Sequence, residues 1–365
     1  MFAYIILILV PIMMYALAIK DRSKAKIFPN IMSNTNKKVL WVFFLILFFL
    51  LAFRSFKVGT DLANYIPRFQ VISNMSWNEI FSNQHWEIGY AILNKLVSIF
   101  SKAPQVFLTI VAGITIIPLA ILYCRESENS LLSISLFLIL PNFCMLFSGL
   151  RQAIAIGLGV PAYYLARKKK IFWFLCIVAF AMLFHKSAFI LLLLYPLLHV
   201  RITKKWLWFV VPCMAIMLLF NARIFNFLLQ FLGETYQNRY GEIESTGAYA
   251  MIILFVLFAV YAFVVPSASK LDADTIGLRN ILLLTVCIQF FAPLNNVAMR
   301  MNYYFLIFLP ILIPKIANRC KESDVKIVSF SKAVMIVFFL VYFFINLATA
   351  TNILNIYPYI PFWAE

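Results

Sequence analysis

Residues 37–54 read KKVLWVFFLILFFLLAFR, an apolar run from Val39 to Phe53 with basic residues at both ends. Similar runs of about 15 to 22 apolar residues recur along the whole chain, and each is long enough for a membrane helix. The chain is 64% hydrophobic and only 12% charged, whereas an ordinary soluble domain carries about 25% charged residues. The sequence therefore predicts an all-α, polytopic integral membrane protein that forms one membrane domain over residues 1–365.

The positive charge is confined to short loops. The net charge is +17, and 18 of the 31 Lys and Arg residues fall within 20–38, 167–170, 201–205 and 315–332. Basic loops between apolar helices mark the cytoplasmic side of a membrane. We therefore place loops 20–38, 167–170, 201–205 and 315–327 in the cytoplasm, and we expect the bilayer, not nucleic acid, to be the partner of this charge.

Threading the chain by these loops predicts about twelve spans with both termini outside. Segments 54–86 and 221–248 become outer loops. Segment 87–100 is too short to span, so we expect a re-entrant or interfacial helix there. Stretches 171–184 and 187–200 predict a helical hairpin with His185 and Lys186 at its tip. The other predicted spans are 2–19, 39–53, 104–123, 130–147, 150–166, 206–220, 249–265, 278–293, 300–316 and 328–347.

Six ionisable residues lie at or just inside the outer ends of the apolar helices. An ionisable group at membrane depth is costly unless it is paired or used, which makes it a candidate for function. Their convergence on one face predicts a polar cavity open to the outside. The six are Arg54, Asp61, Glu87, Arg151, His185 and Arg300.

These residues also have structural interpretations. Arg54 can anchor a helix end by snorkelling, and a carboxylate such as Glu87 is favoured at a helix N-terminus. Arg151 can pair with Asp61 or Glu87, although a guanidinium at this depth otherwise meets an anion such as phosphate. The polar residues from Asn295 to Tyr304 suit either a sugar-binding surface or an interfacial aromatic belt.

No other chemistry is indicated by the sequence. The six cysteines are scattered without paired spacing, so we expect no disulfide framework and no metal site. The chain contains no nucleotide-binding glycine loop. We expect no cofactor, and the Asp272-Ala273-Asp274 stretch is interpreted as solvated cytoplasmic surface.

A set of short motifs gives the chain a family resemblance. The motifs are Arg54 through Gly59-Thr60-Asp61 to Tyr65, Glu87-Ile88-Gly89-Tyr90, Leu150-Arg151-Gln152, Phe184-His185-Lys186-Ser187-Ala188, and Arg300 with Tyr303. In this order, over about residues 40 to 305, they resemble the EpsG group of Wzy-like bacterial polysaccharide polymerases, which act on O-antigen, capsule or exopolysaccharide.

The resemblance implies an enzyme of the bacterial plasma membrane with its site facing outward. Such an enzyme transfers a growing glycan from undecaprenyl pyrophosphate to a sugar hydroxyl of a lipid-linked repeat unit, with a chain-length regulator as a partner. Arg54, Arg151 and Arg300 would hold the pyrophosphate, and Glu87, Asp61 or His185 would act as the base. The expected substrate-binding residues are Lys57, Gly59, Tyr65, Tyr90, Gln152, Lys186, Asn296 and Tyr303.

Three other functions fit parts of the pattern. A flippase or transporter for the same lipid predicts charged sites at mid-membrane and internal repeats, and we find no convincing repeat. An O-antigen ligase type of glycosyltransferase uses the same donor but usually carries a larger outer domain. A membrane acyltransferase would use His185 and leave the arginines without a role.

Overall fold

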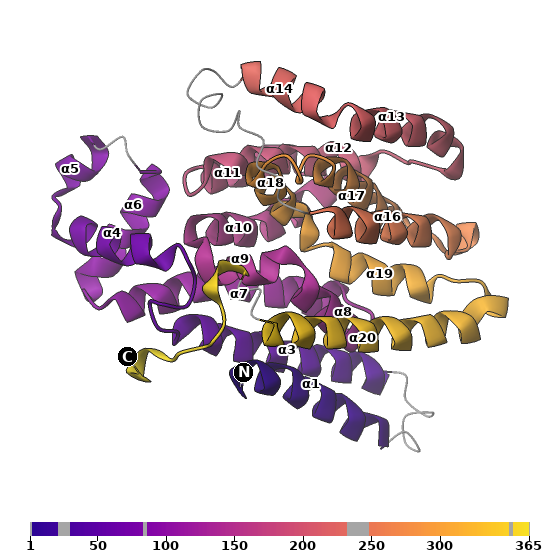
Figure 1. Cartoon of the computed structure of the whole chain (residues 1–365), viewed down its shortest axis with the longest axis horizontal. Helices are drawn as coiled ribbons and strands as arrows, with labels where there is room; N and C mark the ends of the chain where they lie inside the picture. The colour runs from indigo at the N-terminus through magenta and orange to yellow at the C-terminus, as the bar shows by residue number, and fades with distance from the viewer. Residues whose placement is uncertain (1, 21–29, 83–85, 232–247, 350–352, 365) are drawn as a thin grey trace. The chain divides into compact units, whose positions relative to one another are not determined.

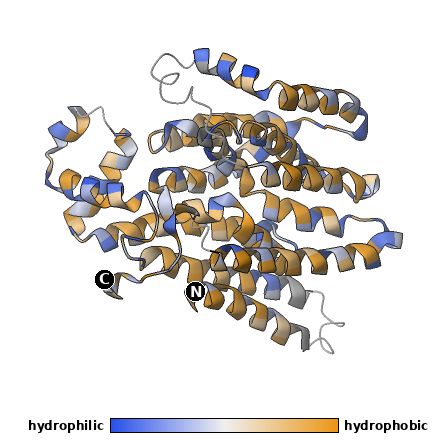
Figure 2. Ribbon diagram, viewed as in Figure 1, coloured by the Kyte–Doolittle hydropathy of each residue, from blue (hydrophilic) through white to orange (hydrophobic). Residues whose placement is uncertain are grey.

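The computed structural model describes residues 2–20, 30–82, 86–231, 248–349 and 353–364, and all regular elements in these ranges are helices. Figure 1 shows the helices along the chain, and Figure 2 shows that apolar residues predominate on the long helices. This confirms the predicted all-α, polytopic membrane class. The described chain divides into two compact units, residues 1–192 with 330–365 and residues 193–329.

The first unit is built on long apolar helices that pack side by side. Helix α3 packs against α1 and α7, and α10 packs against α7 and α11. Its elements are α1 (Phe2–Lys20), α3 (Asn30–Ala52), α4 (Leu62–Asn74), α5 (Trp77–Ser82), α6 (Ile88–Phe100), α7 (Pro104–Glu126), α8 (Ser130–Ile139), α9 (Pro141–Ser148), α10 (Leu150–Arg167), α11 (Ile171–Met182), most of η1 (Lys186–Leu193), most of α20 (Val325–Ala348), η5 (Ile353–Asn355) and η6 (Phe362–Ala364).

Different polar contacts mark the two ends of this unit. At one end Gln105 of α7 donates a hydrogen bond to the Ala52 carbonyl of α3. At the other end Arg167 of α10 pairs with Glu126 of α7 at 2.7 Å, next to the basic run 167–170. The expected cytoplasmic and outer ends of the unit are therefore opposite ends of the same helices.

Helices α4, α5 and α6 lie together at one end of the unit, beside the start of α7 (Figure 1). Apolar residues of α4 and α6 form one buried cluster with residues of α7 and α10, and Phe184 joins it after α11. Phe69 of α4 stacks on Phe107 of α7 at 4.8 Å between ring centroids. Burial of large aromatic side chains is among the strongest contributions to packing, and here it fixes α4 and α6 against the long helices.

The second unit is organised around α17. This helix packs against α12, α16, α18 and α19, and Asp272 caps its N-terminus by accepting from the Thr275 backbone N–H at 2.6 Å. The same carboxylate pairs with Arg319 at 2.6 Å, so Asp272 has a structural role besides its exposure. The elements are α12 (Leu194–His199), η2 (Lys204–Trp206), α13 (Leu207–Leu219), α14 (Asn221–Phe231), α16 (Tyr249–Val264), η3 (Ala268–Lys270), α17 (Ala273–Gln289), α18 (Asn296–Leu306), α19 (Leu309–Asn318) and η4 (Glu322–Asp324).

Three predicted spans differ from the continuous helices we expected. Segment 130–147 is two helices, α8 and α9, which meet at an angle of 66° because Pro141 begins the second and cannot continue the first. Segment 300–316 is divided into α18 and α19, with a bend of 48°. Stretch 187–200 is a 3₁₀ helix, η1, followed by the short α12.

The predicted outer loops contain helices. Segment 54–86 includes α4 and α5, and Pro67 lies inside α4. The first part of 221–248 is α14, bent by 81° from α13, and residues 232–247 lie outside the described part of the chain. Helix α3 starts at Asn30, so it extends into the predicted cytoplasmic loop 20–38.

The number of spans stays a prediction. Among the described residues, three helices are long and apolar enough to cross a membrane, or up to six if each bent pair forms one span. Five further apolar helices have 10–17 residues, and the expected interfacial helix α6 is one of them. The estimate of about twelve spans counted shorter stretches of this kind as full spans.

Candidate active site

Arg151, Glu87 and His185 meet at the end of the first unit opposite the Arg167–Glu126 pair. Arg151 lies in the first turn of α10, Glu87 immediately precedes α6, and His185 follows α11. Arg151 Nη1 donates to Glu87 Oε2, and His185 Nδ1 lies 3.6 Å from Glu87 Oε1. The side chains of Arg151 and His185 are 25% and 24% exposed, so solvent reaches this cluster.

Tyr65 of α4 contacts the same arginine. Arg151 Nε donates to the Tyr65 hydroxyl at 3.3 Å, and its guanidinium carbon lies 5.8 Å from the centre of the Tyr65 ring. The Tyr65 ring also packs on Tyr90 of α6 at 5.6 Å between centroids. Arg151 is therefore held from two sides, by a carboxylate and by a tyrosine.

A close contact between helices brings Glu87 to His185. The Gly89 N–H donates to the Leu183 carbonyl at 2.9 Å, and a Cβ at position 89 would lie only 2.8 Å from the Leu183 Cβ. Only a residue without a side chain permits this approach. Gly89 thus lets α6 begin directly beside the end of α11, which puts Glu87 within reach of His185.

The charges in this cluster stabilise one another. A cation is unfavourable in the first turn of a helix, since the positive end of the helix dipole lies there, and Glu87 offsets this at Arg151. Burial raises the pKa of Glu87, but the adjacent His185 and Arg151 outweigh it and lower the pKa to about 2. Glu87 is therefore a carboxylate at neutral pH and a weak proton acceptor.

A tight turn places Thr60 and Asp61 beside the start of α10. Gly59 has φ +110°, and a Cβ there would lie 2.1 Å from the Phe147 carbonyl oxygen, so glycine is required for both reasons. Ser148 Oγ accepts from the Asp61 backbone N–H at 3.0 Å and lies 3.0 Å from Thr60 Oγ1. The Asp61 side chain is partly exposed, and Lys57 in the same turn is exposed.

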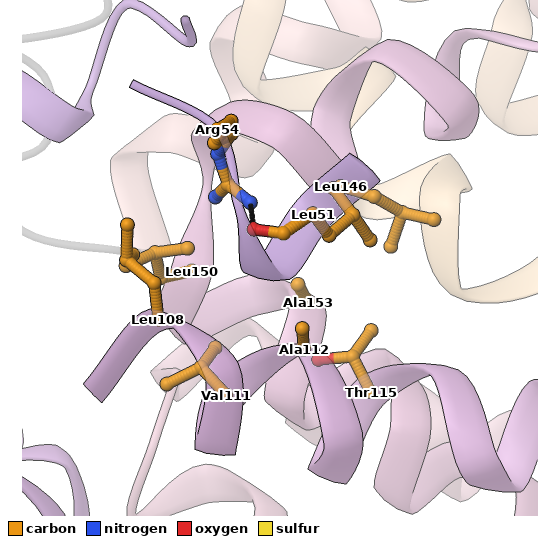
Figure 3. A pocket seen from close by; sticks show the side chains of 9 residues that line it. All are labelled: Leu51, Arg54, Leu108, Val111, Ala112, Thr115, Leu146, Leu150 and Ala153. Atoms are coloured by element: carbon orange, nitrogen blue, oxygen red, sulfur yellow. Dashed lines mark hydrogen bonds between the residues drawn. The ribbon is translucent and has the colours of Figure 1, made fainter. Parts of the chain in front are cut away.

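Arg54 is buried at the start of this turn. Its side chain is 2% exposed, its Nη1 donates to the Leu51 carbonyl, and its Nε has no hydrogen-bond partner among the described residues. Figure 3 shows Arg54 above a small cavity whose lining is otherwise apolar apart from Thr115. Direct contact between Arg54 and a substrate would require a change from this arrangement.

The other expected binding residues of the first unit differ in exposure. Lys186 is exposed next to His185, whereas Tyr90 and Gln152 are buried, with 1% and 4% of their surface accessible. Tyr90 and Gln152 can therefore position their neighbours more readily than they can contact a large glycan.

Arg300, Asn296 and Tyr303 belong to α18 of the second unit. Arg300 is exposed, Tyr303 is 4% exposed, and the side chain of Asn296 lies outside the described residues. The buried Asn302 donates to the Thr285 carbonyl at 3.1 Å and to Gln289 Oε1 at 3.0 Å. Asn302 therefore joins α18 to α17, which is a structural role.

The structure shows two features that sequence reasoning missed. Arg279 of α17 is 3% exposed, donates to the Ile202 carbonyl at 2.6 Å and stacks on Phe263. Residues 353–364 pack on the turn that carries Gly59. The run YPYIPFW at 357–363 was a signal for the second feature, because so aromatic a tail is suited to packing. Within the described ranges, no three His, Cys, Asp or Glu side chains gather as metal ligands.

Comparison with known proteins decides the family. The family model of EpsG proteins matches residues 37–360 of the chain. The chain belongs to the EpsG family. No curated protein and no solved structure matches it. The family match confirms the resemblance found in the motifs, and it indicates a polysaccharide polymerase type of function for this multi-pass membrane protein. All the motifs that carried the resemblance lie within the matched residues of the EpsG-family chain.

Proposed function

We propose that the chain transfers a growing glycan from undecaprenyl pyrophosphate to a sugar hydroxyl of a lipid-linked repeat unit, at the outer face of the bacterial plasma membrane. The observation that carries this proposal is the cluster of Arg151, Glu87 and His185 at the N-terminal end of α10. It combines a solvent-accessible cation with a carboxylate and an imidazole. An anionic leaving group and an acceptor hydroxyl need groups of these kinds.

In this proposal Arg151 stabilises the charge that develops on the leaving pyrophosphate. The bond between the anomeric carbon of the glycan and the pyrophosphate oxygen breaks, and a glycosidic bond to the acceptor oxygen forms. Undecaprenyl pyrophosphate leaves with the electron pair. A guanidinium suits this role because it keeps its charge and donates several hydrogen bonds in a plane.

The acceptor hydroxyl must also lose its proton to a base. Glu87, Asp61 and His185 were the candidates, and the pKa of about 2 for Glu87 makes it a poor acceptor while it is paired with Arg151. We therefore propose that His185 is the base that accepts the proton of the acceptor hydroxyl. Glu87 would orient the imidazole ring and stabilise the imidazolium that forms. Asp61, in the turn beside Ser148, is the alternative base.

The remaining expected residues surround this cluster or belong to the second unit. Lys57 and Lys186 are exposed cations suited to phosphate oxygens, and Tyr65 holds Arg151 in place. Gly59 shapes the turn, and Tyr90 and Gln152 act through packing. Arg300, Asn296 and Tyr303 are kept as candidate sugar-binding residues of the second unit, where Arg300 is exposed and Tyr303 is buried. Arg54 would hold phosphate only after rearrangement. The lipid tails would lie against the apolar helices, and a chain-length regulator would bind the assembled enzyme.

The test is polymerisation by the purified protein of a synthetic undecaprenyl-pyrophosphate repeat unit. We expect a ladder of longer glycans from the wild type and a loss of about 10²–10³-fold in rate for Arg151→Ala. Arg167→Ala is the matched control, because Arg167 lies at the other end of α10 in a comparable ion pair with Glu126. Equal losses in the two variants would remove Arg151 from the site.

Two rival functions give different results in the same preparation. A flippase would produce no ladder but would move the lipid-linked glycan across proteoliposomes. An O-antigen ligase type of enzyme would transfer the glycan only when a different acceptor, such as a lipid A core, is supplied. Either result would overturn the polymerase assignment.

A further inference from the structure

The C-terminal residues 353–364 form a strap across the turn that follows α3. The Leu354 and Asn355 carbonyls accept hydrogen bonds from the backbone N–H groups of Thr60 and Gly59 at 3.1 and 3.0 Å. Further along, the Ser55 N–H donates to the Ile360 carbonyl at 2.8 Å. We call residues 353–364 the C-terminal strap.

Side chains fix the strap to helices α1 and α3. The Tyr4 hydroxyl of α1 donates to the Ile356 carbonyl at 2.6 Å, and the Tyr359 hydroxyl donates to the Leu50 carbonyl of α3 at 3.1 Å. The Tyr4 and Tyr359 rings also pack edge to face, 6.2 Å apart. The Phe362 N–H donates to the Phe53 carbonyl at 2.9 Å, so the strap is attached along its whole length.

The backbone conformation is least favourable at the residues that close the turn. Leu354 and Asn355 have φ of +63° and +51°, a left-handed conformation that residues other than glycine rarely adopt. Such a conformation persists only where surrounding contacts impose it. The carbonyls of these two residues are the ones that accept from Thr60 and Gly59, so the unfavourable conformation coincides with the contact to the turn.

A continuous series of contacts leads from the strap to the cluster. The strap holds Gly59 and Thr60, and the turn in turn places Thr60 and Asp61 on Ser148. Helix α4 starts directly after Asp61 and carries Tyr65, whose hydroxyl accepts from Arg151 Nε. Displacing the strap would therefore remove the backbone contacts that fix the turn before α4, from which Tyr65 reaches the guanidinium of Arg151.

We propose that the C-terminal strap is a positioning element of the active site, which fixes the Gly59 turn and, through Tyr65, the orientation of Arg151. This inference rests on the proposed function for its catalytic consequence, although its structural part does not. The strap residues act through Arg151 and make no contact with the substrate in this role.

The experiment compares the full chain with a variant that ends at residue 352, using two readouts. Amide hydrogen exchange at Gly59 and Thr60 reports on the strap itself, and polymerisation kinetics report on Arg151. We expect protection of both amides to be lost and kcat to fall about 100-fold with little change in KM, because a small misplacement of a catalytic group has this effect. A synthetic peptide of residues 350–365 should restore both.

A double variant of the full-length chain provides the test if the shortened chain does not fold. Tyr4→Phe with Tyr359→Phe removes two hydroxyl groups that bind carbonyls and retains the rings. It should show the same changes, reduced in size. Tyr342→Phe on α20, outside the strap, is the matched control and should behave as the wild type.

The outcomes separate this inference from the proposed function. Unchanged exchange at Gly59 and Thr60, or a shortened chain that polymerises as fast as the wild type or faster, would overturn the positioning role. A shortened chain that polymerises faster than the wild type would show that the strap inhibits the enzyme. Loss of protection in the variants of a chain whose wild type does not polymerise would refute the proposed function and keep the structural role of the strap.

Discussion

The lowered pKa of Glu87 makes the stability of the folded protein depend on pH. Its pKa falls from the usual 4.5 to about 2 in the folded protein, where burial is outweighed by His185 and Arg151. A carboxyl group with a lowered folded pKa contributes stability that is fully present above its unfolded pKa and is lost as the pH falls through the folded one. The contribution of Glu87 should therefore disappear between about pH 4.5 and pH 2.

The first prediction concerns acid unfolding. The thermal stability of the wild type in detergent should fall more steeply between pH 5 and about pH 3 than that of Glu87→Gln, since glutamine does not titrate in this window. Glu322→Gln, at an exposed position of η4, is the control and should keep the wild-type slope. Parallel slopes for all three proteins would show that Glu87 is not the linked group.

The second prediction concerns His185 as the base. His185→Gln should lower kcat by about 10²–10⁴-fold, the usual contribution of a general base, while KM changes little. His199→Gln is the control, because His199 lies at the end of α12, where its Nδ1 is 2.7 Å from the Tyr195 carbonyl oxygen. A normal rate for His185→Gln, combined with a large loss for Asp61→Asn, would show that Asp61 and not His185 is the base.

At the scale of elements, the contact between α6 and α11 decides whether the cluster forms. The N-terminus of α6 touches the backbone after α11 only because residue 89 has no side chain. Helix α6 is otherwise held by its apolar face against α4 and α7. A change at residue 89 should therefore shift the start of the helix and leave the remainder packed.

The third prediction tests this contact with two glycine substitutions. Gly89→Ala should reduce stability by about 1–3 kcal/mol, as overpacking does, and should lower polymerisation because Glu87 moves away from His185. Gly113→Ala in α7 is the control, since its Cβ would meet no atom closer than 3.9 Å. It should be neutral or stabilise by up to about 1 kcal/mol, the helix propensity difference between the residues. Thermal unfolding and rate measurements on both variants would check this, and a stable, active Gly89→Ala protein would contradict it.

At the scale of the whole molecule, the charge at the two ends of the first unit predicts its orientation in the membrane. The Arg151 cluster is at one end of α10, and Arg167 with the basic run 167–170 is at the other. Basic segments stay on the cytoplasmic side. The cluster should then face the exterior, where a lipid-linked repeat unit would be polymerised.

The fourth prediction is the result of labelling introduced cysteines in a background without the six native ones. Lys102→Cys, exposed between α6 and α7, should react with a membrane-impermeant maleimide on intact cells. Lys168→Cys, exposed after α10, should react only after the membrane is permeabilised. The reverse pattern would place the Arg151 cluster in the cytoplasm and exclude polymerisation at the outer face.

The class of the protein and the positions of its longest helices follow from local features of the sequence. Runs such as 39–53, 104–123 and 150–166 coincide with α3, α7 and α10 to within a few residues, except at the start of α3. The length of an apolar run and the charged residues at its ends are features of consecutive residues, so they can be recognised without knowledge of the fold. The same reasoning found Arg151, Glu87 and His185 as separate candidates, because charged residues are costly at membrane depth.

Only the tertiary structure decided how these residues combine. Arg151 and Glu87 are 64 positions apart, and the reach of Glu87 to His185 depends on the approach of Gly89 to Leu183, which no local pattern contains. The bend at Pro141 was visible as a proline, yet its angle depends on packing. The C-terminal strap lies almost 300 residues along the chain from the turn that it binds. Backbone hydrogen bonds of this kind use groups that every residue carries, so the sequence holds no specific record of them.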